Sequence, residues 1–214
     1  SSFEVDGKKM NVQITCHPSG DLITKEIESE RLKKSLVGIN LRFPYPTGNH
    51  TDGASDWQSP EKHQSAIISE NSNSAVFEHH LDSMIYFVRL SWEGKAEIIQ
   101  KEPHYFVLQP AGESKIFSVS AEFSPENNFA EPNTFFQTKE VVAGHWKKFW
   151  ETGGAVDFSE TEDPRAHELE RRVVLSQYLT RIQCAGDLPP QETGLTFNSW
   201  FGKFHLEMHW WHGV

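Results

Sequence analysis

The chain has 214 residues, of which 37% are hydrophobic and 23% are charged, and its formal net charge at pH 7 is −10. This length can bury a full core and suggests one domain with an extension or two small domains. The acidic balance disfavours nucleic acid and anionic membranes as partners, because both need basic patches. The same charge fits a neutral ligand or simply a soluble surface. No apolar run in the sequence approaches the length of about 20 residues that spans a bilayer.

Residues 10 to about 125 carry the signals of β-strands, because apolar and polar residues alternate in short runs that turn residues separate. The expected strands are Val12–Cys16, Leu22–Ile23, Leu36–Phe43, Ser74–Glu78, Ser83–Trp92, Ala96–Gln100, Tyr105–Gln109 and Ser114–Phe123. Many strands at close spacing with little helix between them predict an antiparallel sandwich, a mainly β fold.

A long polar loop interrupts these strands between Pro44 and Lys62. It is rich in residues that break regular structure, and it holds one tryptophan, Trp57. Long loops of this kind on a β scaffold are often functional or mobile. Trp57 is therefore a candidate for contact with a ligand.

The hydrophobic period changes after residue 133. Apolar residues then recur at steps of three and four, which predicts a helix from Thr134 to Thr152 that ends at Gly153-Gly154. We expect three aromatic residues of this linker helix to be core residues that pack it against the sandwich: Trp146, Phe149 and Trp150.

A second helix is expected after a polar connection. Asp163 is the expected N-cap, Pro164 suits the first helical position, and the pattern runs to about Cys184. The expected domains are a sandwich over residues 1–132, a linker helix over residues 133–156, and a helical part over residues 157–214.

The sequence holds only two cysteines, Cys16 and Cys184. They fall in different expected domains, so a disulfide between them would demand a close contact between those domains. We therefore expect two buried free thiols, and the redox compartment stays open.

The segment from Thr196 to Val214, TFNSWFGKFHLEMHWWHGV, is the strongest pointer to function. Its rings are Phe197, Trp200, Phe201, Phe204, Trp210 and Trp211, and its charged and imidazole groups include Lys203, His205 and Glu207. Exposed rings stack on the C–H faces of a sugar, while polar groups pair with its hydroxyls. The segment lacks a helix stop signal, so we expect it to be the first substrate-facing part of a larger carbohydrate enzyme.

Glu207 has two interpretations that the residues alone leave open. Its neighbours Leu206 and Met208 predict a poorly solvated carboxylate, which is costly to bury unless donors pair with it. In the first interpretation, Glu207 forms an ordinary surface ion pair with Lys203, four residues earlier. In the second, it accepts hydrogen bonds from sugar hydroxyls, and the Trp200 ring stacks on the sugar.

His205, His209 and His212 can share one helical face because they are four and three residues apart. Such spacing can bind zinc. However, it is not the His-Glu-x-x-His order that puts a carboxylate base beside two ligands. We favour histidines that pack or form hydrogen bonds, and we expect no metal and no other cofactor.

The order of these elements resembles that of the bacterial six-hairpin glycosidases. The resemblance is carried by HWKKFWETGGAVDFS, ERRVVLSQYLTRIQCAG and LPPQETGLTFNSWFGKFHLEMHWW. The chain is most similar to relatives of the family that includes kojibiose, maltose and trehalose phosphorylases, and of the 1,2-α-fucosidase-like enzymes. The resemblance implies a galactose-mutarotase-like supersandwich, a linker helix and the first segment of an (α/α)6 barrel, in the periplasm or cytoplasm of a bacterium.

Members of these families often carry a Gly-His-x-Phe-Trp-Asp-Thr-Glu segment where the first barrel hairpin meets the sugar. Gly202 matches the glycine, and Glu207 falls where the aspartate would be. Leu206 replaces the tryptophan, and His209 stands where the glutamate would be. The resemblance implies that Glu207 contacts the terminal sugar and that Trp200 lies nearby as a platform.

The resemblance also places the general acid and the base on later barrel helices, and inverting hydrolysis needs two carboxyl groups about 6.5–9.5 Å apart. We therefore expect a non-catalytic part of a glycoside hydrolase or phosphorylase for α-linked oligosaccharides. Its partners would be an oligosaccharide or terminal sugar and the remainder of the barrel. The alternative is a stand-alone carbohydrate-binding β-sandwich without enzymatic activity. The expected substrate-binding residues are Trp57, Trp200, Lys203, His205 and Glu207.

Overall fold

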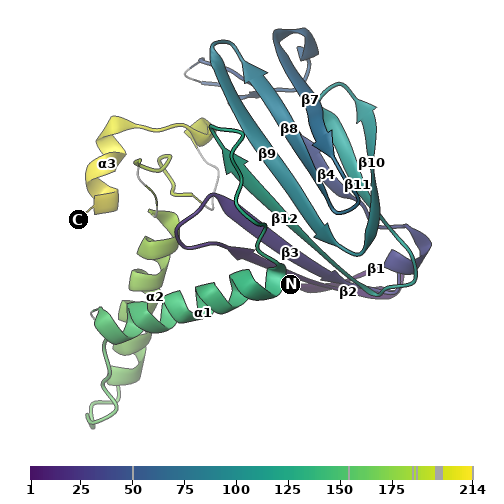
Figure 1. Cartoon of the computed structure of the whole chain (residues 1–214). Coiled ribbons are helices and arrows are strands. Elements are labelled where there is room, and N and C mark those ends of the chain that lie inside the picture. The colour runs from purple at the N-terminus through teal and green to yellow at the C-terminus, as the bar shows by residue number, and fades with distance from the viewer. Residues whose placement is uncertain (50, 154, 185, 187, 196–199, 214) are drawn as a thin grey trace. The chain divides into compact units, whose positions relative to one another are not determined.

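The computed structural model describes residues 1–214 except 50, 154, 185, 187, 196–199 and 214. It consists of antiparallel β-sheets followed by helices, which confirms the predicted fold class (Figure 1). The chain forms two compact units. The sandwich unit contains Ser1–Tyr45 and Trp57–Lys147, and the helical unit contains Pro46–Asp56 and Lys148–Val214. None of the described helices is both long and apolar enough to cross a membrane.

The larger sheet of the sandwich unit has seven strands in the order β1-β2-β3-β12-β9-β8-β7. In that order the strands are Ser2–Val5, Lys8–Cys16, Leu22–Glu28, Ile116–Ser124, Met84–Glu93, Ser74–Leu81 and His63–Glu70. All paired neighbours are antiparallel. Neither β1 nor β7 was expected. In β7, the consecutive apolar residues Ala66, Ile67 and Ile68 obscure the alternation that predicts a strand.

The smaller sheet of this unit has three antiparallel strands in the order β10-β11-β4, which Figure 1 labels. In that order the strands are Lys95–Glu102, Tyr105–Ala111 and Ile39–Arg42. Two short strands, β5 Tyr45–Pro46 and β6 Ser55–Asp56, form a separate ribbon in the expected loop 44–62. The short 3-10 helices are Leu32–Lys34, Pro60–Lys62 and Trp200–Gly202.

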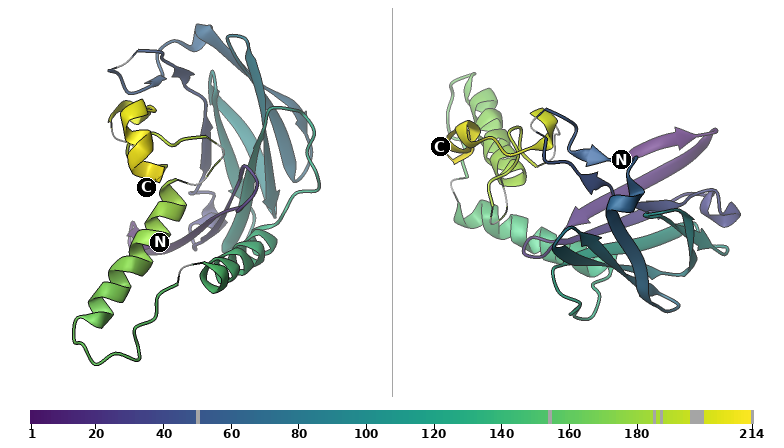
Figure 2. Two further views of the ribbon diagram at one scale, coloured as in Figure 1. Left: turned by 90° about the vertical axis from the view of Figure 1, so that its left-hand side faces the viewer. Right: turned by 90° about the horizontal axis from the view of Figure 1, so that it is seen from above.

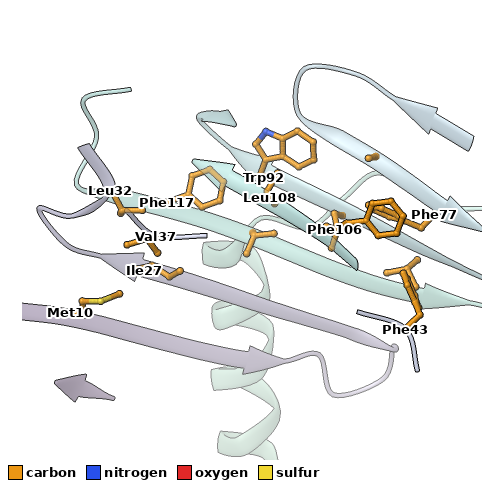
Figure 3. Close-up of a cluster of buried hydrophobic side chains, with 14 residues drawn as sticks. Met10, Ile27, Leu32, Val37, Phe43, Phe77, Trp92, Phe106, Leu108 and Phe117 are labelled. Carbon is orange, nitrogen blue, oxygen red and sulfur yellow. The ribbon is translucent and has the colours of Figure 1, made fainter. Parts of the chain in front are cut away.

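Apolar side chains from the two sheets meet in one core (Figure 3). Phe77, Val88 and Trp92 come from the larger sheet, and Phe106 and Leu108 come from β11. The rings of Phe77 and Phe106 meet edge to face with their centroids 4.9 Å apart. Burial of each such side chain contributes about 1.5–3 kcal/mol, so this packing holds the two sheets together.

Helix α1, Phe135–Thr152, confirms the expected linker helix. Its start is a capping box. The Gln137 amide donates to the Thr134 hydroxyl at 3.2 Å, and the Thr134 amide donates to the Gln137 side-chain oxygen at 2.9 Å. At the other end, the Gly153 amide donates to the Phe149 carbonyl at 3.0 Å.

The expectation that Trp146, Phe149 and Trp150 are core residues is wrong, because all three are only half-buried. The buried residues of α1 are Phe135 and Thr138, in its first turn. Only this early part of the helix supplies core side chains, and the helix beyond Lys147 belongs to the helical unit.

Helix α2, Ala166–Gln183, begins three residues after the expected N-cap. The Asp163 carboxylate does not cap it. Instead it accepts the Arg165 amide at 2.9 Å and the Arg165 guanidinium at 2.8 Å. Helix α3, Leu206–Gly213, lies in the run that was expected to be helical. The expected division of the chain at residues 132 and 156 stays a prediction.

Cys16 and Cys184 are both free, as expected. The expectation that they are buried is wrong. Cys16 is exposed and Cys184 is half-buried, because each lies at the end of its element, where packing is thinner than in the middle.

Candidate functional site

In the helical unit, Lys203 forms an ion pair with Asp52, a residue 151 positions away in the sequence. The distance from Lys203 Nζ to Asp52 Oδ1 is 3.0 Å, and the two side chains are 19% and 34% exposed. Figure 2 shows the hairpin that contains Asp52 beside the yellow C-terminal segment. The ion pair therefore joins part of the expected loop to the aromatic segment.

Asp52 is the centre of a polar network in this hairpin. Thr47 Oγ1 donates to Asp52 Oδ1, Asn49 Nδ2 donates to Oδ2 at 2.9 Å, and the Ala54 amide donates to Oδ1 at 3.0 Å. The bond from Thr47, followed by that from Lys203, lowers the pKa of the Asp52 carboxyl well below its usual range. Asp52 is thus an ionised anchor that orders the hairpin and fixes the Lys203 ammonium.

The backbone before α3 makes a tight left-handed turn. The φ angles of Trp200, Phe201 and Gly202 are 47°, 65° and 65°. Bulky residues rarely adopt this conformation, and each one costs of order 1–3 kcal/mol. Such strain concentrates at functional sites, and Trp200 in this turn is 57% exposed.

His205 lies beside Trp200. Its Nε2 is 3.3 Å from the Trp200 carbonyl oxygen, and the two rings stand edge to face with centroids 6.1 Å apart. The same nitrogen is 3.7 Å from Glu192 Oε2, and the two side chains are only 14% and 13% exposed. This arrangement suits His205 for holding the tryptophan turn in place.

The expectation that the Glu207 carboxylate is poorly solvated is wrong, and so is its expected ion pair with Lys203. Glu207 is exposed, in the first turn of α3. Lys203 binds Asp52 and lies outside α3, because residues 203–205 are not helical and the helix begins only at Leu206. Glu207 therefore presents its carboxylate to solvent.

Most apolar residues that the structure describes in this segment are exposed rather than sealed in a core. The most exposed are Trp200, Phe204, Leu206, Trp210 and Trp211, at 57%, 48%, 78%, 68% and 69% exposure. Large exposed apolar patches of this kind usually bind a ligand or a partner.

The metal interpretation involves His209 and His212, whose side chains lie outside the described residues. Among the residues that the structure describes, no group of three or more His, Cys, Asp or Glu could hold a metal ion. The candidate site therefore rests on the aromatic and polar side chains.

Trp57 belongs to the sandwich unit, whereas the other four expected substrate-binding residues belong to the helical unit. Its ring is 48% exposed, and the Arg42 guanidinium lies 4.9 Å from its centroid. The same guanidinium lies 4.7 Å from the Tyr105 centroid. Trp57 thus forms part of a separate aromatic stack.

Sequence reasoning missed Asp52 and Glu192. The Asn-x-Thr-Asp-Gly signal around Asp52 indicates a turn, which the structure has. No local signal connects that turn with Lys203, because the partners are far apart in the sequence. Glu192 follows Pro189-Pro190, and two consecutive prolines indicate only a rigid link.

No family model matches the sequence, and no curated protein matches it. Among solved structures, the chain is similar to one described as a putative kojibiose phosphorylase from human microbiome, with 9% identity and a TM-score of 0.36. The match covers 84% of this chain and 23% of that chain. This similarity is weak and is limited to the level of the fold.

Proposed function

We propose that the chain is the N-terminal sandwich, linker helix and first barrel segment of a glycoside hydrolase or phosphorylase that acts on α-linked oligosaccharides. The observation that supports this most is the exposed Trp200 ring beside the polar groups of Lys203 and His205 in the helical unit. A flat apolar face next to charged and imidazole groups is the chemistry that a sugar needs.

Each residue has its own role in this proposal. The Trp200 ring stacks on the C–H face of a sugar, and the exposed Glu207 carboxylate accepts hydrogen bonds from its hydroxyls. Lys203, fixed by Asp52, donates to a hydroxyl, since an ammonium has three donors. His205 keeps the tryptophan turn in position.

The chain by itself would bind sugar without cleaving it. Asp52 is tied to Lys203, and Glu192 lies near His205, so their contacts fit positioning roles. In this proposal the general acid and the base belong to the remainder of the barrel, as inverting mechanisms place one carboxyl group on each side of the scissile bond.

An alternative is a carbohydrate-binding sandwich without enzymatic activity. It is favoured by the stack of Trp57, Arg42 and Tyr105 in the sandwich unit, which places a half-exposed ring on the β scaffold. Here the sugar would bind to Trp57, independently of the aromatic segment.

A calorimetric titration of the chain with maltose and kojibiose separates these functions. If the first is correct, Trp200→Ala weakens sugar binding by about tenfold, through the loss of the stacking face, and Trp57→Ala leaves it unchanged. The reverse pattern would favour the alternative. Phe136→Ala is the matched control, because Phe136 is an exposed ring on α1, 65% exposed. Saturable binding by neither sugar would contradict both functions.

Catalysis is tested on the full-length product of the gene. We expect it to cleave α-linked disaccharides, with phosphate dependence deciding between phosphorolysis and hydrolysis. Glu207→Gln should reduce kcat/KM for the sugar, whereas Glu207 would be dispensable if it were only a surface residue.

A further inference from the structure

A row of hydroxyl groups crosses the outer face of the seven-stranded sheet. Ser74 on β8 pairs with Ser91 on β9, Ser91 pairs with Ser120 on β12, and Ser120 pairs with Thr24 on β3. Paired residues place their side chains on the same face of a sheet. This is the face opposite the core, because the neighbours of Ser91 in the strand, Leu90 among them, point into the core.

A segment that we call the strap, Phe129–Thr134, crosses this face between β12 and α1, and Figure 1 shows its course. Arg89 holds it by donating to the Ala130 carbonyl, and the Phe129 ring lies 4.9 Å from the guanidinium. Ser120 Oγ donates to the Asn133 carbonyl at 3.0 Å. The strap is thus tied to the sheet at two points.

Between the strap and the hydroxyl row lies a pocket of about 410 Å³. Its size is within the range of small-molecule sites, roughly 300–1,000 Å³. The Ser91 hydroxyl in its lining is buried and has no hydrogen-bond partner among the described residues. Ser118, 5% exposed, adds a second hydroxyl to the lining. A buried hydroxyl without a partner is costly, so a ligand hydroxyl placed here would find a ready partner.

The charges around the pocket select against anions. The Arg89 guanidinium, 10% exposed, is neutralised by its ion pair with Glu122. Glu93 and Glu131, which also line the pocket, add negative charge. A lining of hydroxyls with no unneutralised cation suits a neutral ligand that carries several hydroxyls.

We propose that this pocket binds a neutral polyhydroxylated small molecule. The ligand lies between the strap and the sheet and exchanges hydrogen bonds with Ser91 and Ser118. The site is in the sandwich unit and does not depend on the proposed function of the helical unit.

The test is a titration of the ¹⁵N-labelled chain by NMR with D-glucose, sorbitol and sodium phosphate as probes. We expect saturable shifts at residues 89–93, 118–120 and 129–134 with glucose or sorbitol and none with phosphate. Glucose alone would indicate a cyclic sugar, and sorbitol alone an acyclic polyol. Saturation by phosphate, or by no probe, would overturn the proposal.

Two variants sharpen this test. Ser118→Leu fills the pocket and should weaken binding by about tenfold or more, and Ser91→Ala removes the unpartnered hydroxyl and should weaken it as well. Ser69→Leu, exposed on β7 and outside the pocket, is the control. If Ser118→Leu fails to fold, wild-type affinity in Ser91→Ala overturns the proposal. Trp200→Ala should bind the probe normally, which separates this pocket from the site in the helical unit.

Discussion

His63 and His79 meet edge to face inside the sandwich unit, with their ring centroids 5.2 Å apart. His104 stacks on His63 at 3.8 Å, and Phe43 stacks on His79 at 4.6 Å. The His79 side chain is fully buried, and neither ring nitrogen has a hydrogen-bond partner among the described residues. Burial, followed by the charges of His63, His104 and His80, lowers the pKa of His79 to about 4.

This cluster predicts that the sandwich loses stability in mild acid. Above pH 6.5, His79 is neutral in the folded and the unfolded chain and contributes no pH dependence. Between pH 6.5 and about 4, the unfolded chain takes up a proton that the folded chain does not, so the free energy of unfolding falls by up to about 3 kcal/mol. Urea unfolding measured across this range tests the slope.

His79→Phe should flatten that slope, since a ring of similar shape without a titratable nitrogen remains. His167→Phe, at an exposed position on α2, should retain the wild-type slope. Equal slopes for wild type and His79→Phe would contradict this assignment.

The Asp52–Lys203 ion pair predicts coupled effects on the hairpin 46–56. Asp52→Asn removes the charge that Thr47, Asn49 and Lys203 contact, so amide hydrogen exchange at residues 47–54 should become faster. Lys203→Met should have a similar but smaller effect, because the Thr47 and Asn49 bonds remain. The double variant should be no worse than Asp52→Asn. Additive effects would show that the two residues act separately.

The capping box at the start of α1 predicts a defined loss of stability. Thr134→Ala removes the hydroxyl that accepts the Gln137 amide and should cost about 1 kcal/mol in urea unfolding. Thr134→Ser keeps that hydroxyl and should remain close to wild type. If both variants lost the same free energy of unfolding, the loss would not come from the capping hydroxyl.

The contact between the two sheets predicts a larger loss. Phe77 is 0% exposed and meets Phe106, so Phe77→Ala should cost about 3–5 kcal/mol. Phe136→Ala, at a ring that is 65% exposed, should cost far less. A small effect of Phe77→Ala would mean that the core collapses around the deletion.

The sequence predicted the class of the fold and the α1 helix because these depend on local patterns. The alternation of apolar and polar residues predicted most of the strands, and the spacing of three to four residues between apolar residues from Phe135 onward predicted the helix. β7 was missed because Ala66, Ile67 and Ile68 are consecutive and suppress the alternation.

The candidate site was less predictable, because its contacts join distant residues. A pairing of Lys203 with Glu207 presumes a helix through both residues, whereas α3 begins only at Leu206, three residues after Lys203. The partner of Lys203 is Asp52, which no spacing rule connects to it. Whether Trp200 and Glu207 contact a sugar stays a prediction.

The left-handed pair Trp200 and Phe201 also has a consequence for protein engineering. Glycine at position 201 would adopt its φ of 65° without steric cost and should raise the melting temperature. The same replacement would free the indole to sample other orientations. A more heat-resistant protein obtained in this way would recognise its ligand less well, so thermal tolerance and recognition should trade against each other at this one position.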